Sequence, residues 1–289
     1  MVKKRDVLRI IIGYVLALIV GFFVYQYVES ILGIFYALLI ADIAMTFLIF
    51  IGSVLYNNSS FYDPYWSVVP PFLVVTMMLA LDQVHVWSIL VLLAVLVWAC
   101  RLTFNWYKNF IGFEKEDFRY IDFRKKFPKT YWLISLLAVH LFPTLMVFLG
   151  LVPIYLFLQE DVVRPIFVVL GCLTIVSGSI ISYYADEQMR DHQKNKYSHA
   201  MKEGLWSISR HPNYLGELMM WFGVMVISFS VSYDFIQTLG FLAMLALFEL
   251  YSIPRMEKRL SARKADYEEV KLEVSRVFPF AYIKRFLSK

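Results

Sequence analysis

The segment GLWSISRHPNYLGELMMWFGVMVISFS, residues 204–230, joins a short polar motif to a long apolar run. Pro212 is well placed for the first turn of a helix, where its missing N–H leaves no hydrogen bond unmade. Asn213 and Glu217 are four positions apart, so they share one face of that helix. The segment therefore predicts a helix that enters a membrane and carries its polar residues in its first turns.

Two further polar residues lie directly before this helix, Arg210 and His211. The first N–H groups of a helix have no partner within the helix, and its N-terminus carries a partial positive charge. A cation, an imidazole and these N–H groups would meet at a membrane surface, which suits phosphate binding. We expect Glu217 one turn deeper, facing the space that the other helices enclose.

The composition is typical of an integral membrane protein. Hydrophobic residues make up 60% of the 289 residues, charged residues make up 18%, and the mean hydropathy is +0.61. Soluble domains are closer to half apolar and about a quarter charged. Most of the eight apolar segments reach the roughly 20 residues that cross a bilayer, at about 7–28, 31–55, 67–81, 86–107, 131–158, 166–184, 214–231 and 235–253. We predict an all-α bundle of about eight transmembrane helices.

The basic residues favour one orientation of this bundle. Lys and Arg gather at the N-terminus and in the stretches 108–129, 190–210 and 255–289, whereas the opposite connections contain only Arg164. Because basic loops stay on the cytoplasmic side, both termini are expected there. Such loops and anionic lipid head groups account for the net charge of +5 without nucleic acid. Cys100 and Cys172 lie in apolar segments and predict no disulfide framework, and the histidines show no metal-ligand spacing.

Three acidic positions each permit two interpretations. Asp42 lies mid-membrane and is either a structural carboxyl bonded to a neighbouring helix or a functional group. Asp63, followed by Pro64, is either the N-cap of a helix or part of a pocket mouth with Tyr62 and Tyr65. The aromatic pair also fits a membrane-edge belt. Asp186 could form only a surface pair with a residue four positions later, or could accept from ribose hydroxyls.

Arg101 and Asn105 lie four positions apart at the cytoplasmic end of one segment. Arg101 could merely extend to the head groups, or the two together could hold a phosphate and an amide or ribose. His140 is deep in its segment and is either a buried, bonded histidine or a proton donor. Residues 255–283 form a basic amphipathic segment that lies along the head groups or covers the cytoplasmic mouth as a lid.

No motif of the common soluble enzymes occurs, and no repeat or flexible linker divides the chain. We therefore predict one membrane domain over residues 1–289. Residues 1–58 would be N-terminal packing helices, and residues 59–283 would form the core, which ends in the amphipathic segment.

The motif SRHPNYLGE, preceded by GLW, resembles the signature of the steroid 5-alpha-reductase C-terminal superfamily. Sterol C14 reductases and isoprenylcysteine carboxyl methyltransferases have related versions of it. The ordered motifs YDPYWSVVP, RLTFNWYKNF, ADEQMR, SRHPNYLGE and SIPRMEKRL resemble an uncharacterised reductase-like branch over about residues 60–280. Residues 1–28 then look like an extra helix beside the usual seven.

The resemblance implies a bundle whose C-terminal half binds NADPH from the cytoplasmic side, with the nicotinamide directed toward a conjugated double bond of a lipid. The cofactor-binding residues that it implies are Arg101, Asn105, Asp186, Arg210, His211, Asn213 and Tyr214. The candidate catalytic residues are Asp63, Glu217, Tyr62 and Tyr65. This chain differs from the steroid enzymes at two positions. Asp63 occupies the place of a glutamate, and Trp98 occupies the place of a proton-donating tyrosine.

We therefore expect an NADPH-dependent reductase of a lipid double bond, in a bacterial inner membrane rather than the endoplasmic reticulum. The alternative is an S-adenosylmethionine-dependent methyltransferase of the isoprenylcysteine carboxyl type. That family carries paired glutamates after its last crossing, where this chain has only Glu257. A third interpretation is a non-catalytic membrane scaffold that retains a relic pocket.

Overall fold

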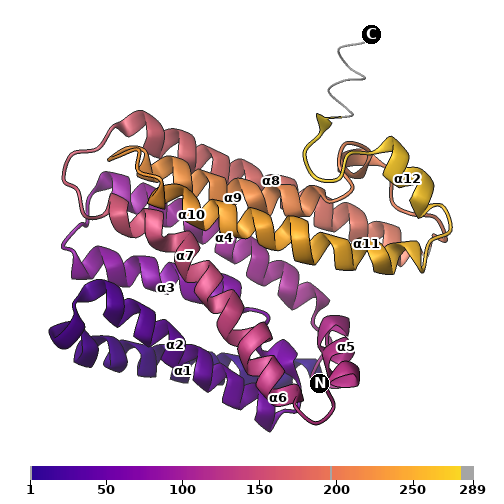
Figure 1. Cartoon of the computed structure of the whole chain (residues 1–289), viewed down its shortest axis with the longest axis horizontal. Coiled ribbons are helices and arrows are strands. Elements are labelled where there is room, and N and C mark those ends of the chain that lie inside the picture. Colours follow the sequence, from indigo (N-terminus) through magenta and orange to yellow (C-terminus); the bar gives the residue numbers. More distant parts are fainter. Residues whose placement is uncertain (1, 196, 281–289) are drawn as a thin grey trace. The chain divides into compact units, whose positions relative to one another are not determined.

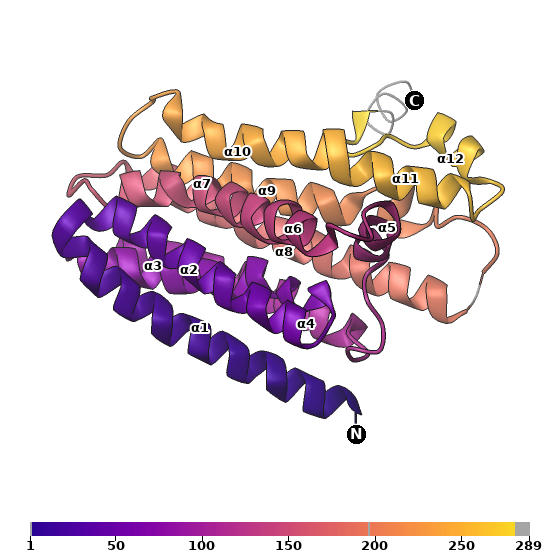
Figure 2. The same cartoon turned by 60° about the horizontal axis from the view of Figure 1, so that its bottom comes forward.

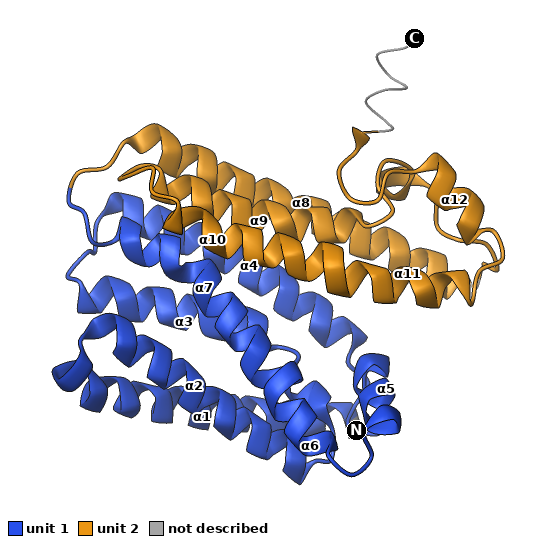
Figure 3. Cartoon of the chain, in the orientation of Figure 1, with its two compact units in different colours: residues 1–161 blue, residues 162–289 orange. Residues whose placement is uncertain are grey.

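The computed structural model describes residues 2–195 and 197–280. Across these residues the chain is all-α, and the extended pairing within them is one isolated parallel bridge between Ser209 and Ser275. The chain divides into two compact units, Met1–Asp161 and Val162–Lys289 (Figure 3). The predicted all-α class is thus confirmed, while the assignment of one domain stays a prediction.

Unit 1 is built from long helices joined by short turns. Its helices are α1 (Val2–Leu32), α2 (Ile34–Leu55), η1 (Ser59–Tyr62), α3 (Tyr65–Ala80), α4 (Val86–Asn109), α5 (Phe118–Lys126), α6 (Tyr131–Ile134), η2 (Ser135–Leu141) and α7 (Phe142–Phe157). Helix α1 runs along α2 (Figure 2), and α3 packs against α4. The reversal between α1 and α2 occurs at Gly33, whose φ of +79° is a conformation that glycine adopts readily.

The predicted segment 131–158 forms one continuous helix of changing pitch. Residues Ser135–Leu141 wind as a π-helix immediately before Pro143, which stands near the start of α7. Proline has no N–H to donate to the preceding turn, and wider turns of this kind absorb such interruptions. His140 lies in this π-helical stretch and is fully buried within unit 1.

Unit 2 contains a pair of closely packed helices and a folded C-terminal segment. Its helices are α8 (Pro165–Lys194), η3 (Gly204–Ser207), α9 (Pro212–Ser228), α10 (Ile236–Ala246), η4 (Leu247–Ser252), α11 (Ile253–Ser261) and α12 (Tyr267–Glu273). Helices α8 and α9 lie side by side (Figure 1). The predicted amphipathic segment 255–283 is divided between α11 and α12, and its residues 281–283 lie outside the described part of the chain.

The eight apolar segments are largely helical, although segment 31–55 contains the break at Gly33 between α1 and α2. Six of the described helices are long and apolar enough to cross a membrane. These six are Lys3–Leu32, Ile34–Leu55, Val86–Asn109, Tyr131–Phe157, Pro165–Lys194 and Ile236–Ser261. Helices α3 and α9 span 16 and 17 residues. Large apolar side chains such as Leu8, Ile12 and Phe23 are more than half exposed on α1, as in a helix that faces lipid. The chain is accordingly a multi-pass membrane protein.

Candidate functional site

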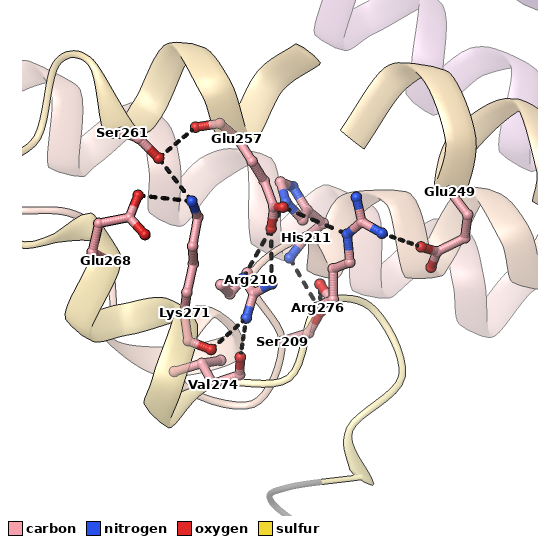
Figure 4. A network of polar contacts seen from close by, with 10 residues as sticks. All are labelled: Ser209, Arg210, His211, Glu249, Glu257, Ser261, Glu268, Lys271, Val274 and Arg276. Atoms are coloured by element: carbon pink, nitrogen blue, oxygen red, sulfur yellow. Dashed lines mark hydrogen bonds and ion pairs between the residues drawn. The ribbon is translucent and has the colours of Figure 1, made fainter. Parts of the chain in front are cut away.

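The C-terminal segment of unit 2 folds back onto the motif before α9 and binds Arg210. The backbone N–H of Arg210 donates to the Ser275 carbonyl at 2.8 Å. Its guanidinium donates to Glu257 Oε1 from Nε at 3.0 Å and lies 2.9 Å from the same oxygen through Nη2. Nη1 donates to the carbonyls of Lys271, at 2.9 Å, and Val274 (Figure 4). Arg210 therefore joins three parts of the chain.

His211 contacts the same carboxylate and is almost fully buried. Its Nε2 lies 3.3 Å from Glu257 Oε1, and its backbone N–H donates to Ser209 Oγ at 3.1 Å. Burial lowers the pKa of the His211 imidazole below its ordinary value. A neutral ring with its proton on Nε2 fits the contact with Glu257. The His211 ring also stacks on the Tyr214 ring, with the two ring centroids 5.6 Å apart.

A second guanidinium completes the surroundings of Glu257. Arg276 Nη1 lies 3.0 Å from Glu249 Oε2, and Arg276 Nε lies 3.5 Å from Glu257 Oε2. We call Arg210, His211, Glu257 and Arg276 the Glu257 cluster. Two cations and an imidazole surround one carboxylate, so the cluster ties α11 and residues 271–276 to the start of α9 (Figure 4).

Helix α9 begins at Pro212, as the sequence predicts, and Asn213 lies in its first turn. The Oδ1 atom of Asn213 is buried and has no hydrogen-bond partner in the structure. The Asn213 carbonyl accepts from Ser182 Oγ at 2.9 Å. Asp186 follows Ser182 by one turn of α8, and Glu217 follows Asn213 by one turn of α9, both partly buried. The Ser182–Asn213 hydrogen bond thus joins α8 to the first turn of α9 within unit 2.

Two of the predicted catalytic residues meet in the interior of unit 1. The Tyr62 and Tyr65 rings stack with centroids 5.0 Å apart and an interplanar angle of 17°. Tyr65 donates its hydroxyl proton to Asp42, with Oδ1 at 2.7 Å and the carbonyl at 2.9 Å. The Tyr62 hydroxyl lies 2.9 Å from Thr144 Oγ1. Asp42, Tyr62 and Tyr65 are all at most 2% exposed, so a carboxyl–phenol pair lies in a dry interior.

Asp63 has a different partner and is not the N-cap of α3. The N-cap residue of α3 is Pro64, and no side chain caps that helix. The N-cap interpretation of Asp63 is therefore wrong, because its Oδ1 accepts the hydroxyl proton of Tyr120 at 2.7 Å instead. Burial raises the pKa of the Asp63 carboxyl to about 7.

Arg101 and Asn105 lie one turn apart on α4, and both are partly buried. Asn105 Oδ1 accepts from Asn109 Nδ2 at 3.1 Å. These two residues belong to unit 1, whereas the other predicted cofactor-binding residues belong to unit 2. Their joint role in one cofactor channel stays a prediction.

Several polar residues of these sites were missed or left undecided in the sequence. Glu257 and Tyr120 carried no predicted role, and Asp42 was left open between a structural and a functional carboxyl. A lone acidic residue between basic ones in RMEKRL was the available signal for Glu257. Among the described residues, no group of three or more His, Cys, Asp or Glu side chains could hold a metal ion.

Comparison with known proteins identifies the family of the chain. A family model described as "Protein of unknown function (DUF1295)" matches residues 49–274, from within α2 to the residue after α12. No curated protein and no solved structure matches the chain. The matched residues include the catalytic candidates of unit 1 and all of the Glu257 cluster except Arg276. Because the match covers well over half of the chain, the protein belongs to the DUF1295 family.

Proposed function

We propose that the chain is a membrane enzyme that reduces a conjugated double bond of a lipid with NADPH. The observation that carries this proposal is the buried Asp42–Tyr65 pair beside Tyr62. Reduction of a polarised double bond needs a hydride at one carbon and an acid near the carbonyl oxygen. Bound NADPH would supply the hydride. A phenol held by a carboxyl in a dry interior would supply the proton.

The pair has the chemistry of a proton donor. Tyr65 and Asp42 share a hydroxyl proton between oxygens 2.7 Å apart. Addition of a hydride to the β carbon would leave negative charge on the lipid carbonyl oxygen. Tyr65 would protonate that oxygen, and the enol would return to the ketone with a proton on the α carbon. One C=C bond, one hydride and one proton then give the saturated product.

The start of α9 offers groups suited to the cofactor. Asn213 Oδ1, a buried acceptor without a partner, could accept an N–H from the carboxamide of a nicotinamide. The N-terminus of α9 favours phosphate groups. Arg210 already binds Glu257. It would bind a phosphate of the cofactor either beside that carboxylate or in its place. Asn213 is therefore a better probe of cofactor binding than Arg210.

The membrane arrangement in this proposal has eight crossings. Helices α3 and α9 are slightly shorter than the roughly 20 residues of a typical span. Together with the six longer helices they would give the eight crossings. An even number of crossings puts both basic termini on the cytoplasmic side. A bacterial inner membrane is the proposed location, and membrane lipids would reach the enzyme from within the bilayer.

The first test is thermal stability in detergent with NADPH, NADH, S-adenosylmethionine or no ligand. A ligand at 100 times its Kd adds about 2.7 kcal/mol to the free energy of unfolding. We expect NADPH to stabilise the protein, and Asn213→Ala to reduce that shift. Asn195→Ala, an exposed position at the end of α8, is the control and should retain it. Stabilisation by S-adenosylmethionine alone would replace the reductase with a methyltransferase.

The second test is NADPH oxidation in the presence of a panel of enone lipids. Loss of a general acid lowers the rate by about 10²- to 10⁴-fold, and we expect this range for Tyr65→Phe and Asp42→Asn. Tyr36→Phe, an exposed tyrosine on the same helix as Asp42, should keep full activity. Folded protein that binds NADPH but oxidises it with no lipid would contradict the proposed reaction.

A further inference from the structure

One carboxylate oxygen of Glu257 is shared by three nitrogen atoms at the start of α9. Its Oε1 lies 3.0 Å from Arg210 Nε, 2.9 Å from Arg210 Nη2 and 3.3 Å from His211 Nε2. The guanidinium fork of an arginine binds an anion best through two parallel hydrogen bonds to two oxygens. Here both arms of the fork converge on one oxygen, because Glu257 Oε2 faces Arg276 Nε at 3.5 Å (Figure 4). A carboxylate therefore matches these donors incompletely.

A phosphate group would match the same donors better. A terminal phosphate has three oxygens, so two of them would bind the Arg210 fork and the third would face Arg276. The neutral His211 ring would donate from Nε2 to one of these oxygens. His211 is also the N-cap residue of α9, and the N-terminus of a helix favours negative charge.

The charges of the cluster favour exchange of the anion over addition of a second one. The guanidinium groups of Arg210 and Arg276 already face the carboxylates of Glu257 and Glu249. A phosphate beside Glu257 would therefore meet a like charge at close range, where little water screens it. The Arg276 side chain is 37% exposed, whereas those of Arg210 and Glu257 are 10% and 12% exposed. An anion from water would thus meet Arg276 first and replace the carboxylate behind it.

Exchange would leave the segment that follows α12 attached. Arg210 Nη1 donates to the carbonyls of Lys271 and Val274, and the Arg210 backbone N–H donates to the Ser275 carbonyl. None of these bonds uses the two nitrogens of Arg210 that face Glu257. A phosphate on the fork would therefore release only the side chain of Glu257, which belongs to α11.

We propose that Arg210, His211 and Arg276 form a phosphate site in which Glu257 is a built-in competitor. The carboxylate of Glu257 leaves the Arg210 fork when a phosphate group binds, and it returns when that group dissociates. The assignment of the phosphate to NADPH rests on the proposed reduction. A phospholipid head group offers the same chemistry from the bilayer, so the two sources are separated by experiment.

The test is calorimetric binding of inorganic phosphate, NADPH and dihexanoyl phosphatidic acid to the protein in detergent, at constant ionic strength. Glu257→Gln keeps the length of the side chain and an acceptor for Arg210, but it removes the competing charge. We expect this variant to bind inorganic phosphate at least about tenfold more tightly than wild type. Glu268→Gln is the matched control, because Glu268 is 67% exposed and pairs with Lys271 at 2.8 Å. It should bind phosphate as wild type does.

Equal affinity for inorganic phosphate in wild type and Glu257→Gln would overturn the competition, and so would an equal gain in Glu268→Gln. The double variant Glu257→Gln with Arg276→Gln should lose the gain, which would assign it to this site. If Glu257→Gln does not fold, Glu257→Asp serves instead. It keeps the charge but ends one methylene earlier, which draws the carboxylate away from the fork, and it should show part of the gain.

The three ligands separate the site from the proposed reduction. Tighter binding of both inorganic phosphate and NADPH to Glu257→Gln would support the site and its assignment to the cofactor. Tighter binding of inorganic phosphate and phosphatidic acid, with no binding of NADPH, would retain the site and reject NADPH as the ligand. Binding of NADPH that does not change in Glu257→Gln, together with unchanged binding of phosphate, would reject the site and leave the reduction standing.

Discussion

Arg210 and Glu257 are 47 positions apart, and two guanidinium nitrogens of Arg210 lie 3.0 and 2.9 Å from one oxygen of Glu257. The pair is nearly buried, with side chains 10% and 12% exposed. The same guanidinium holds the carbonyls of Lys271 and Val274. A residue that the sequence suggests for phosphate binding thus also holds the C-terminal segment in place.

Arg210→Ala should strongly destabilise the C-terminal segment. Removing one partner of a buried ion pair costs about 3–5 kcal/mol, and because Arg276 still lies 3.5 Å from Glu257 we expect the lower end of this range. We expect a lower Tm in detergent and faster hydrogen exchange over residues 267–277. Lys194→Ala is the control, since Lys194 and Asp191 form an ion pair in which both side chains are 67% exposed, and such pairs contribute about 0–1 kcal/mol. Similar losses in the two variants would contradict a structural role for Arg210.

His211 should make the stability of the protein depend on pH in the acidic range. Its pKa in the folded state is lowered from 6.5, so the unfolded state binds more protons between these two pKa values. The contribution of His211 is therefore complete above about pH 6.5 and is lost as the pH falls below it. Chemical unfolding at several pH values measures this slope. His211→Gln, which stays neutral, should reduce the slope below about pH 6.5, and an unchanged slope would reject the assignment.

The local features of this chain could be predicted because they depend on neighbouring residues. Pro212 begins α9 as its position in the sequence indicates. Arg101 and Asn105 are one turn apart because the helical period places residues i and i+4 on one face. The eight apolar segments are largely helical for a different local reason: a continuous apolar run in a membrane must satisfy its own backbone hydrogen bonds, and a helix does so.

The partners of the buried polar groups could not be predicted in this way. Tyr65 binds Asp42 across 23 positions, and Asp63 binds Tyr120 across 57 positions. Periodicity assigns a residue to a helix face but does not say which other helix that face meets. The N-cap prediction for Asp63 failed on this point, because a phenol from α5 competes for the carboxyl that a local motif would have used.

Gly216→Ala should separate α8 from α9. A Cβ at Gly216 would lie 2.1 Å from Ser182 Oγ and 2.3 Å from the Gly178 carbonyl oxygen, and backbone cannot move aside as a flexible side chain can. Overpacking of this kind costs about 1–3 kcal/mol or more, and Tm should fall accordingly. Gly33→Ala is the comparison that separates backbone strain from overpacking. Its added Cβ meets nothing within 4 Å, so only the positive φ of Gly33 is unfavourable. We expect the smaller loss there, about 1–2 kcal/mol, and the reverse order would contradict close packing of α8 and α9.

Asp63 should have the opposite pH dependence from His211. Its pKa is raised from 3.8 to about 7 in the folded state, so between these values the folded protein binds a proton that the unfolded chain has lost. The free energy of unfolding should be highest below the unfolded pKa, decline as the pH rises toward about 7, and then remain constant.

The contribution of Asp63 can be isolated by comparing variants. Asp63→Asn keeps an acceptor for the Tyr120 hydroxyl but cannot ionise, so the difference in stability between wild type and Asp63→Asn should change with pH only between about 4 and 7. Tyr120→Phe removes the hydrogen bond and leaves the carboxyl in place. Because that carboxyl still titrates, Tyr120→Phe should lower stability and keep most of the pH dependence. If the difference in stability between wild type and Asp63→Asn stays constant between about pH 4 and 7, the Asp63 carboxyl is ionised in the folded protein throughout that range and its pKa is not raised.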